Sequence, residues 1–292
     1  MFEQVVFAGG GNRCWWQAGW WDVVAPAIEL KPRVIAGVSA GAATACMLYA
    51  NDSRWTMDYY REALEHNRRN AYWGNLFRRA RDPNQPHAAR VFPHAAIYRR
   101  ALHDILGGER FAKLKAEAPE IRISYALLPR GLGPRAALAV GLIAYTVEKY
   151  ARKSLHPTFG RRIGFTPEVA RVQDCADIDD LVSLITASSC TPPFTPIEHR
   201  GGRPTLDGGM VDNVPVDALE AGPSTLVLLT RRYPGRADRF THRGRVYVQP
   251  SKKVPISAWD YTDPAAMQLT YEQGRSDGER FADGYVAAAR AG

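Results

Sequence analysis

The stretch that decides the fold is Arg33-Val34-Ile35-Ala36-Gly37-Val38-Ser39-Ala40-Gly41, an apolar run that leads directly into a G-x-S-x-G pentapeptide. The apolar run predicts a short buried strand. Small residues around a serine allow a sharp turn from a strand into a helix, which holds the hydroxyl where a substrate carbonyl can reach it. The pattern nominates Ser39 as a nucleophile, with Gly37 and Gly41 supporting the turn. A plain helix start with Ser39 near the N-cap is the structural alternative.

The residues on either side of this turn repeat a strand–helix pattern. A buried strand is expected at residues 5–8, a helix at 13–30, a second strand at 34–37 and a small-residue helix at 40–50. Strands that alternate with helices favour a parallel sheet with helices on its faces. The fold class predicted from the sequence is therefore α/β.

The rest of the chain adds further elements without an evident break. Strands are expected at 121–128, 225–229 and 245–248, and helices at 177–188 and from Pro264 toward the C-terminus. Because no linker separates two units, we expect one domain over residues 1–292. Its motifs fall within about 3–216, and the last strands and helix within 223–292.

Charge and composition limit the partners. The 292 residues are 46% hydrophobic and 23% charged, as in ordinary globular proteins, and the net charge is +8. A basic protein favours anionic surfaces, either phospholipid headgroups or nucleic acid. Basic clusters at 68–69, 78–81 and 161–162 are candidate contacts with an anionic bilayer.

Cysteines and signal segments point to a cytoplasmic protein without a metal. Cys14, Cys46, Cys175 and Cys190 have no C-x-x-C spacing and no histidine at ligand spacing, which predicts reduced thiols. The N-terminus lacks the basic and apolar regions of a secretory signal.

One segment has the apolar character of a membrane contact. Residues 136–147 form an apolar run of twelve residues, too few to span a bilayer. We expect a buried helix there. A helix lying in the lipid interface is the alternative, because arginine and lysine flank the run.

The triple glycine Gly9-Gly10-Gly11 is the candidate oxyanion site. Consecutive glycines between a strand and a helix can turn backbone N–H groups toward an anion. The rival interpretation is the dinucleotide fingerprint G-x-G-x-x-G. It would need glycine where Cys14 stands and an acidic residue where Ser39 stands.

Two residues are candidates for the base. In Asp207-Gly208-Gly209, the glycines let the backbone approach closely and aim the carboxylate, and burial would raise its pKa into a useful range. The order Ser39, Asp207, His242 also satisfies a Ser…Asp…His triad. The residues around His242 show no pattern of a supported catalytic loop, so we favour Asp207.

Taken in order, the motifs closely resemble those of the patatin-like phospholipase family. They are residues 8–13 (AGGGNR), 37–41 (GVSAG), 187–194 (ASSCTPPF) and 206–209 (LDGG). The resemblance implies a three-layer fold with a central, mostly parallel sheet and helices on both faces. The family often has aspartate at the position of Ala8 and glycine at that of Cys14, so a side chain here enters the glycine loop.

The resemblance also implies a function. It assigns Ser39 as nucleophile, Asp207 as base, and the amides of Gly9, Gly10 and Gly11 as an oxyanion hole with Arg13 close by. Gly208 and Gly209 support the base. The implied reaction is hydrolysis of lipid acyl esters, of the phospholipase A or lysophospholipase kind, with no metal or other cofactor. An anionic membrane, rather than nucleic acid, is then the expected partner. A non-catalytic lipid-binding or regulatory protein that keeps the fold is the alternative. The motifs do not indicate an oligomeric state.

Four tryptophans follow the glycine loop, at positions 15, 16, 20 and 21. On a helix they cover too wide an arc to lie entirely in the core. We expect one or two of them to line an acyl cavity or to face lipid.

Overall fold

The computed structural model describes residues 2–77, 91–131, 159–192 and 194–291, together with residues 133, 135–136, 139–140, 143, 146 and 154–156. The basic cluster predicted at 78–81 lies outside the described residues. So do seven of the twelve positions of the apolar run, at 137, 138, 141, 142, 144, 145 and 147.

The centre of the molecule is a parallel sheet. Its strands lie in the order β3-β2-β1-β7-β9. Their bounds are Gln4–Phe7 for β1, Val34–Val38 for β2, Glu120–Leu127 for β3, Thr225–Leu228 for β7 and Arg245–Val248 for β9. Strands β1, β2 and β7 are wholly buried, as expected for the middle of a parallel sheet. The expected α/β fold with a mostly parallel central sheet is confirmed.

Four antiparallel strands extend the sheet, and the sequence did not predict them. β4 (Thr166–Arg171) and β6 (Arg203–Asp207) pair with β3, β5 (Glu198–Arg200) pairs with β6, and β8 (Arg239–His242) pairs with β9. They are short and rich in charged residues, and two contain proline, so their hydrophobic period is weak. The pairing of β6 with β3 sets Tyr125 opposite Asp207.

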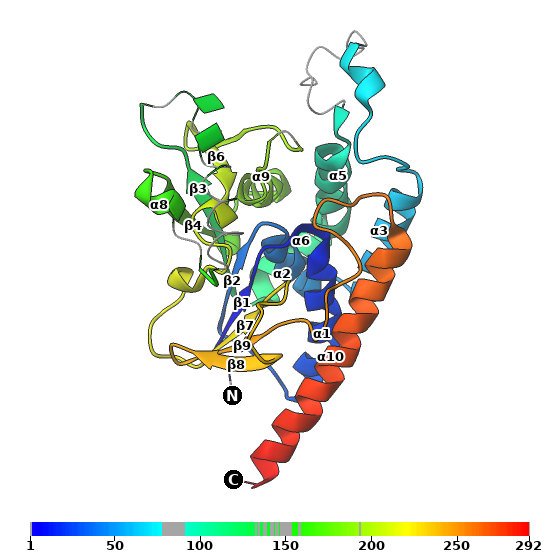
Figure 1. Ribbon diagram of the computed structural model, residues 1–292, viewed down its shortest axis with the longest axis vertical. Helices are drawn as coiled ribbons and strands as arrows, with labels where there is room; N and C mark the ends of the chain where they lie inside the picture. The colour runs from blue at the N-terminus through cyan, green and yellow to red at the C-terminus, as the bar shows by residue number, and fades with distance from the viewer. Residues whose placement is uncertain are drawn as a thin grey trace.

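Helices cover both faces of the sheet, long ones on one side and short ones on the other (Figure 1). The long ones are α1 (Trp15–Ala27), α2 (Ala40–Ala50), α3 (Ser53–Glu65), α5 (His94–Leu106), α6 (Glu109–Glu117), α9 (Ile178–Ser188) and α10 (Pro264–Ala291). The other face is covered by α8 (Phe159–Arg162) and the 3-10 turns η4 (Gly208–Met210) and η5 (Val216–Ala218). The remaining 3-10 turns are η1 (Gly11–Cys14), η2 (Trp73–Phe77) and η3 (Val172–Asp174).

Two observations bear on membrane contact. No helix in the described part of the chain is long and apolar enough to cross a bilayer. Within the apolar run at 136–147, Val140 is 44% exposed and Ile143 is 65% exposed. The expected burial is therefore wrong at these positions, because apolar composition alone does not tell a core helix from one that faces outward.

The last helix is held against the first by glycines. A Cβ at Gly274 of α10 would lie 2.1 Å from the Trp16 carbonyl oxygen, and one at Gly19 of α1 would lie 2.0 Å from the Tyr271 carbonyl oxygen. The Trp16 indole N–H also donates to Asp277 at 2.7 Å. The two helix backbones are thus in direct contact.

We predict that Gly274→Ala lowers the free energy of unfolding by about 2 kcal/mol, since the new methyl group has to push two backbones apart. Gly284 is the matched control on the same helix, where a Cβ would meet nothing within 4 Å. There alanine raises stability by up to about 1 kcal/mol through helix propensity. Urea unfolding of both variants checks the pair. Equal effects of the two substitutions would contradict the close helix contact.

Candidate active site

Ser39 lies at the sharp turn between β2 and α2. Its φ is 54° and its ψ is −138°, a left-handed conformation that is strained for any residue except glycine. Ser39 occupies the N-cap position of α2, as the structural alternative expects, but its side chain makes no capping hydrogen bond to the helix. Its N–H donates to Ser188 Oγ at 2.8 Å, and the Ser188 hydroxyl donates to the Ser124 carbonyl at 2.6 Å. The strained turn is therefore tied to α9 and β3.

The glycines around Ser39 are required by close approach. A Cβ at Gly41 would lie 2.5 Å from the Ala8 carbonyl oxygen, and one at Gly37 would lie 2.6 Å from Ala42 Cα. Real Cβ atoms are essentially never so close to backbone atoms. The turn is thus pressed against the end of β1.

Asp207 ends β6 beside this turn. Its carboxylate accepts the Gly209 N–H at 2.7 Å, and the side chains of Ser39 and Thr191 lie close enough to it to lower its pKa. Burial raises the pKa of Asp207 to about 6, against the opposing effect of these three neighbours. A carboxyl group with this pKa is ionised at neutral pH and still basic enough to accept a proton. The structure thus brings together Ser39 and Asp207, which lie 168 positions apart in the sequence.

The residues after Asp207 are as crowded as those around Ser39. A Cβ at Gly208 would lie 2.5 Å from the Ser124 carbonyl oxygen, and one at Gly209 would lie 2.9 Å from Asn213 Oδ1. Gly208 thus has no room for a side chain, and at Gly209 the side chains of Asn213 and Asp207 would have to shift to admit one.

The glycine loop follows β1, and Gly9 packs directly against Ser39. A Cβ on Gly9 would be 3.3 Å from that of Ser39. The Gly9 N–H donates to the Asn213 carbonyl at 3.1 Å. Within the described residues, no acceptor is found for the amides of Gly10 and Gly11. Of the three predicted oxyanion donors, the amides of Gly10 and Gly11 therefore remain available to donate, whereas the Gly9 amide already donates to Asn213.

Three side chains fix the direction of those two amides. The Gly9 carbonyl accepts from Asn213 Nδ2 at 2.9 Å and from Thr230 Oγ1 at 2.8 Å. The Gly10 carbonyl accepts from Arg13 Nε at 3.1 Å. In a trans peptide the N–H points opposite to the preceding carbonyl, so holding these carbonyls holds the amides of Gly10 and Gly11 on the other side. Arg13 thus lies close to the loop and donates to the Gly10 carbonyl.

Cys14, at the position where the family often has glycine, fits inside the loop. It is buried, its thiol is 3.7 Å from the Ala8 carbonyl oxygen, and burial raises its pKa to about 12. It is an uncharged packing residue that shares one wall with Ser39.

A cavity opens beside Ser39 and runs along one face of α2. Its space, solvent at the mouth included, is about 810 Å³. The lining residues of α2 recur at helical spacing, at positions 40, 43, 44, 47 and 48. Eight residues of rise correspond to a length of ~12 Å. Trp15 lines the cavity, whereas Trp16 and Trp20 are fully buried in the core and Trp21 is 7% exposed. One tryptophan of the four faces the cavity.

No histidine that the structure describes hydrogen-bonds to Ser39 or Asp207. His242 lies on β8, and its ring contacts are with His156 and Tyr247. His94 does line the cavity, but its Nε2 is 3.0 Å from the Trp259 carbonyl oxygen, and burial lowers its pKa. In the described part of the chain, no group of three or more His, Cys, Asp and Glu side chains is placed to hold a metal ion.

Sequence reasoning missed the residues that support the site. Asn213, Thr230 and Ser188 are ordinary polar residues, and each contacts a partner at least 149 positions away. Only Ser188, inside the ASSCTPPF motif, carried a signal in the sequence.

A comparison with protein-family models identifies the family to which this sequence belongs. The model of the patatin-like phospholipases matches residues 5–220, which include the glycine loop, the Ser39 turn and Asp207. The chain belongs to the patatin-like phospholipase family. Lipid acyl hydrolysis is the activity of this family.

Comparisons with individual proteins add little. Among solved structures the chain is similar to VipD from Legionella pneumophila, with 10% sequence identity and a TM-score of 0.47. The match covers 97% of this chain and 67% of VipD. The curated proteins contain no match to this patatin-like chain.

Proposed function

We propose that this protein is a serine acyl hydrolase of lipids in which Ser39 is the nucleophile and Asp207 the base. The observation that carries the proposal is the contact between the Ser39 hydroxyl and a buried carboxylate whose pKa is raised to about 6. A strained turn that presents the serine and a cavity that begins beside it support the same conclusion. We also propose that residues 1–292 form a single domain, since α10 packs on α1.

The first half of the reaction forms an acyl-enzyme. Ser39 Oγ attacks the ester carbonyl while its proton passes to Asp207. The amides of Gly10 and Gly11 donate to the oxyanion of the tetrahedral intermediate, because their fixed direction requires no reorganisation during the reaction. The intermediate then collapses, the bond to the alcohol breaks, and the departing alkoxide takes the proton from Asp207.

The second half repeats these steps with water. Asp207 accepts a proton from a water molecule, whose oxygen attacks the acyl carbonyl. The same two amides hold the second oxyanion. The bond to Ser39 Oγ breaks, Ser39 recovers its proton from Asp207, and the fatty acid leaves. Asp207 is ionised at the start and at the end of the cycle.

The cavity supports an acyl chain as the buried part of the substrate. Its walls include Trp15, Met47, Leu48 and Tyr60. An extended chain of roughly ten carbons fills a length of ~12 Å. We therefore propose esters of single medium-length acyl chains as preferred substrates, with the alcohol part outside.

We predict that Ser39→Ala lowers kcat by roughly a millionfold and that Asp207→Asn is nearly as severe, because the two residues act as one unit. Hydrolysis of p-nitrophenyl esters and phospholipids measures the loss. A fluorophosphonate probe should label the wild-type protein at Ser39 and leave the Ser39→Ala protein unlabelled. Retained esterase activity in either variant contradicts the dyad. An unlabelled and inactive wild-type protein means that this is a lipid-binding member of the family.

A second prediction concerns pH. Asp207 must be ionised to accept a proton, and its pKa is raised to about 6, so kcat/KM should rise with pH up to that value and level off above it. Below it, the rate should fall about tenfold per pH unit. Circular dichroism over the same range serves as the control for unfolding. A limb that is still rising above pH 7 would indicate a different base.

A third prediction concerns chain length. Ala43→Phe places a ring in the cavity one turn from Ser39 and should lower kcat/KM for decanoate esters at least tenfold while sparing acetate esters, since about 0.8 kcal/mol is lost for each excluded methylene. Leu48→Ala is the matched change at the end of the cavity far from Ser39. It should favour esters of longer acyl chains, because it removes side-chain volume there. A uniform loss for all esters with Ala43→Phe would show that the acyl chain binds elsewhere.

A further inference from the structure

The positive charge of this protein is concentrated in one segment. Residues 231–253 contain eight Lys and Arg and a single acidic residue, Asp238, so this segment carries a charge of +7 out of the +8 of the whole chain. The remaining 30 basic and 29 acidic residues nearly balance. The basic residues are Arg231, Arg232, Arg236, Arg239, Arg243, Arg245, Lys252 and Lys253.

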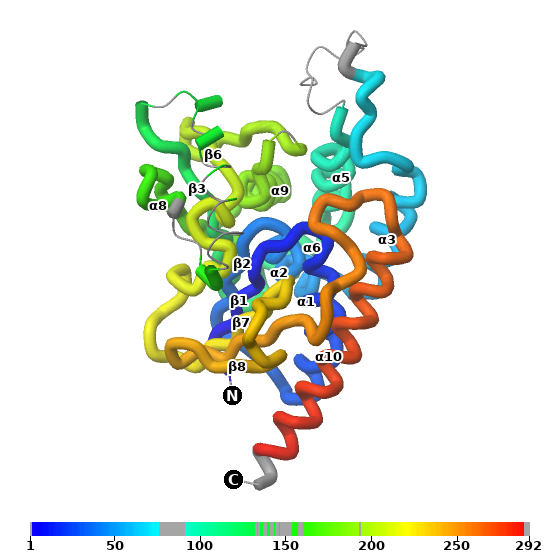
Figure 2. Tube along the Cα trace, viewed as in Figure 1, coloured from blue at the N-terminus to red at the C-terminus, as the bar shows by residue number. Residues whose placement is uncertain are grey.

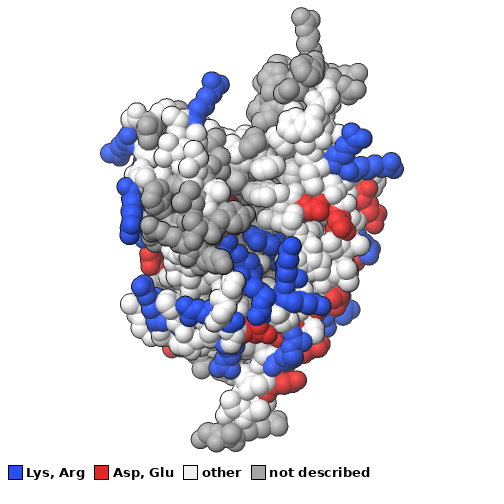
Figure 3. Space-filling view, in the orientation of Figure 1, with Lys and Arg blue, Asp and Glu red and all other residues white. Residues whose placement is uncertain are grey.

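These side chains face solvent. Arg236, Arg239, Arg243, Lys252 and Lys253 are exposed, and the other three are half-buried. Figure 3 shows Lys and Arg gathered in the middle of one face, in front of β7 and β9. Among the described residues, an acidic partner is found only for Arg232, which contacts Asp238 at 2.6 Å. The positive charges also act on a neighbouring side chain. Partial burial, together with the charges of Arg236 and Arg243, lowers the pKa of His242.

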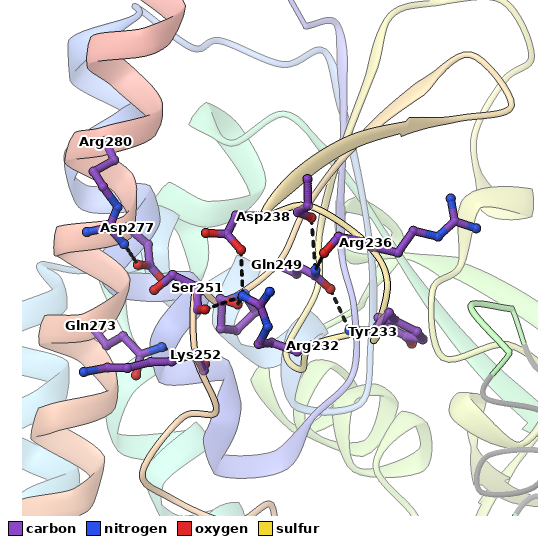
Figure 4. A network of polar contacts seen from close by, with 12 residues as sticks. Arg232, Tyr233, Arg236, Asp238, Gln249, Ser251, Lys252, Gln273, Asp277 and Arg280 are labelled. Atoms are coloured by element: carbon purple, nitrogen blue, oxygen red, sulfur yellow. Dashed lines mark hydrogen bonds and ion pairs between the residues drawn. The ribbon is translucent and has the colours of Figure 1, made fainter.

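Hydrogen bonds from buried side chains hold the backbone of this segment in place. The side chain of Gln249 is buried, accepts the Tyr233 N–H at 2.7 Å and donates to the Arg236 and Ala237 carbonyls (Figure 4). Arg232 donates to the Pro250 carbonyl at 2.9 Å.

The same network ties the segment to α10. The Ser251 N–H donates to Asp277, and Gln273 donates to the Lys252 carbonyl (Figure 4). The backbone that carries Arg232, Arg236 and Lys252 is thus fixed by hydrogen bonds.

Both ends of the segment adjoin the candidate active site. Thr230, the residue before it, donates to the Gly9 carbonyl. Five residues after Lys253, the Ala258 carbonyl accepts the Asn12 N–H, and Ala258 and Trp259 line the cavity. The chain that joins β9 to α10 accordingly passes beside the glycine loop (Figure 2). The two ends of the segment therefore lie near the glycine loop, whereas the turn that carries Arg243 lies at the start of β9, toward the other end of the sheet.

We propose that residues 231–253 form a docking surface for an anionic phospholipid bilayer. The choice of occupant rests on the proposed function, since a lipid hydrolase must reach esters held in a membrane. Each Lys or Arg near an anionic bilayer contributes on the order of a fivefold gain in binding. The aromatic side chains of the segment are unsuited to stacking with bases, because Tyr233 and Tyr247 are buried and Phe240 lies under Arg236.

This surface differs from the clusters expected from the sequence. Arg161 is paired with Asp217 at 2.8 Å, which leaves that cluster partly neutralised. Arg68 and Arg69 are exposed, but they are only two. They supply a matched comparison.

The test measures co-sedimentation with phosphatidylcholine vesicles that contain or lack phosphatidylglycerol. The wild-type protein should bind the anionic vesicles only, and less as NaCl is raised. Arg243→Asn/Lys252→Gln/Lys253→Gln should weaken binding on the order of a hundredfold. Asparagine is chosen at 243 because Arg243 has a φ of 51°, which asparagine tolerates. The control Lys31→Gln/Arg68→Gln/Arg69→Gln removes the same charge from elsewhere and should bind almost as wild type.

Two further measurements separate this surface from the dyad. Hydrolysis of a soluble acetate ester should be unchanged in the 243/252/253 variant, and Ser39→Ala should bind vesicles normally. Equal loss of vesicle binding in the two triple variants overturns the proposal. So does wild-type binding that is equally strong with and without phosphatidylglycerol. Binding of double-stranded DNA that is lost in the 243/252/253 variant, with vesicle binding unaffected, would reassign the surface to nucleic acid. Normal vesicle binding by an inactive wild-type protein would remove the proposed function and keep the docking surface.

Discussion

The structure depends on the close contact between the Ser39 turn and the end of β1. The Ala8 carbonyl leaves no room for a Cβ at Gly41, and Gly9 packs tightly against Ser39. The strained backbone of Ser39 persists because the Ser188 hydroxyl holds its N–H. From this contact follow the position of α2, the line of the cavity along it, and the place where the glycine loop can meet a substrate carbonyl.

In the proposed mechanism, Asp207 acts as the base, and its environment determines whether a carboxylate can do so. A carboxylate in water is too weak a base, and a fully desolvated one would stay protonated. Here burial raises the pKa while Ser39, Thr191 and the Gly209 amide limit the rise to about 6. The Gly209 amide that holds the side chain in place thus also helps to set its basicity. His242, the alternative in the sequence, lies with His156 and Tyr247 at another part of the sheet.

The sequence predicts the parts of this molecule that depend on local pattern. Buried parallel strands such as β2 are continuous apolar runs, and the tight turns require glycine, so the sheet centre and the positions of Ser39 and Asp207 were all predictable. Edge strands such as β4, with Pro167 and alternating exposed residues, carry no such signal. Thr230 and Asn213 act through partners more than 200 positions away, which no local pattern reveals.

The glycine contact between α1 and α10 has a consequence for where this domain ends. The family match stops at residue 220, yet Ala258, Trp259 and Tyr261 form part of the cavity wall, and α10 covers Trp16 and Trp20. A chain cut at residue 220 would expose those two indoles and open the cavity on one side. The part of the chain that encloses the cavity is therefore longer than the part that the family model matches, and residues after 220 complete the cavity wall.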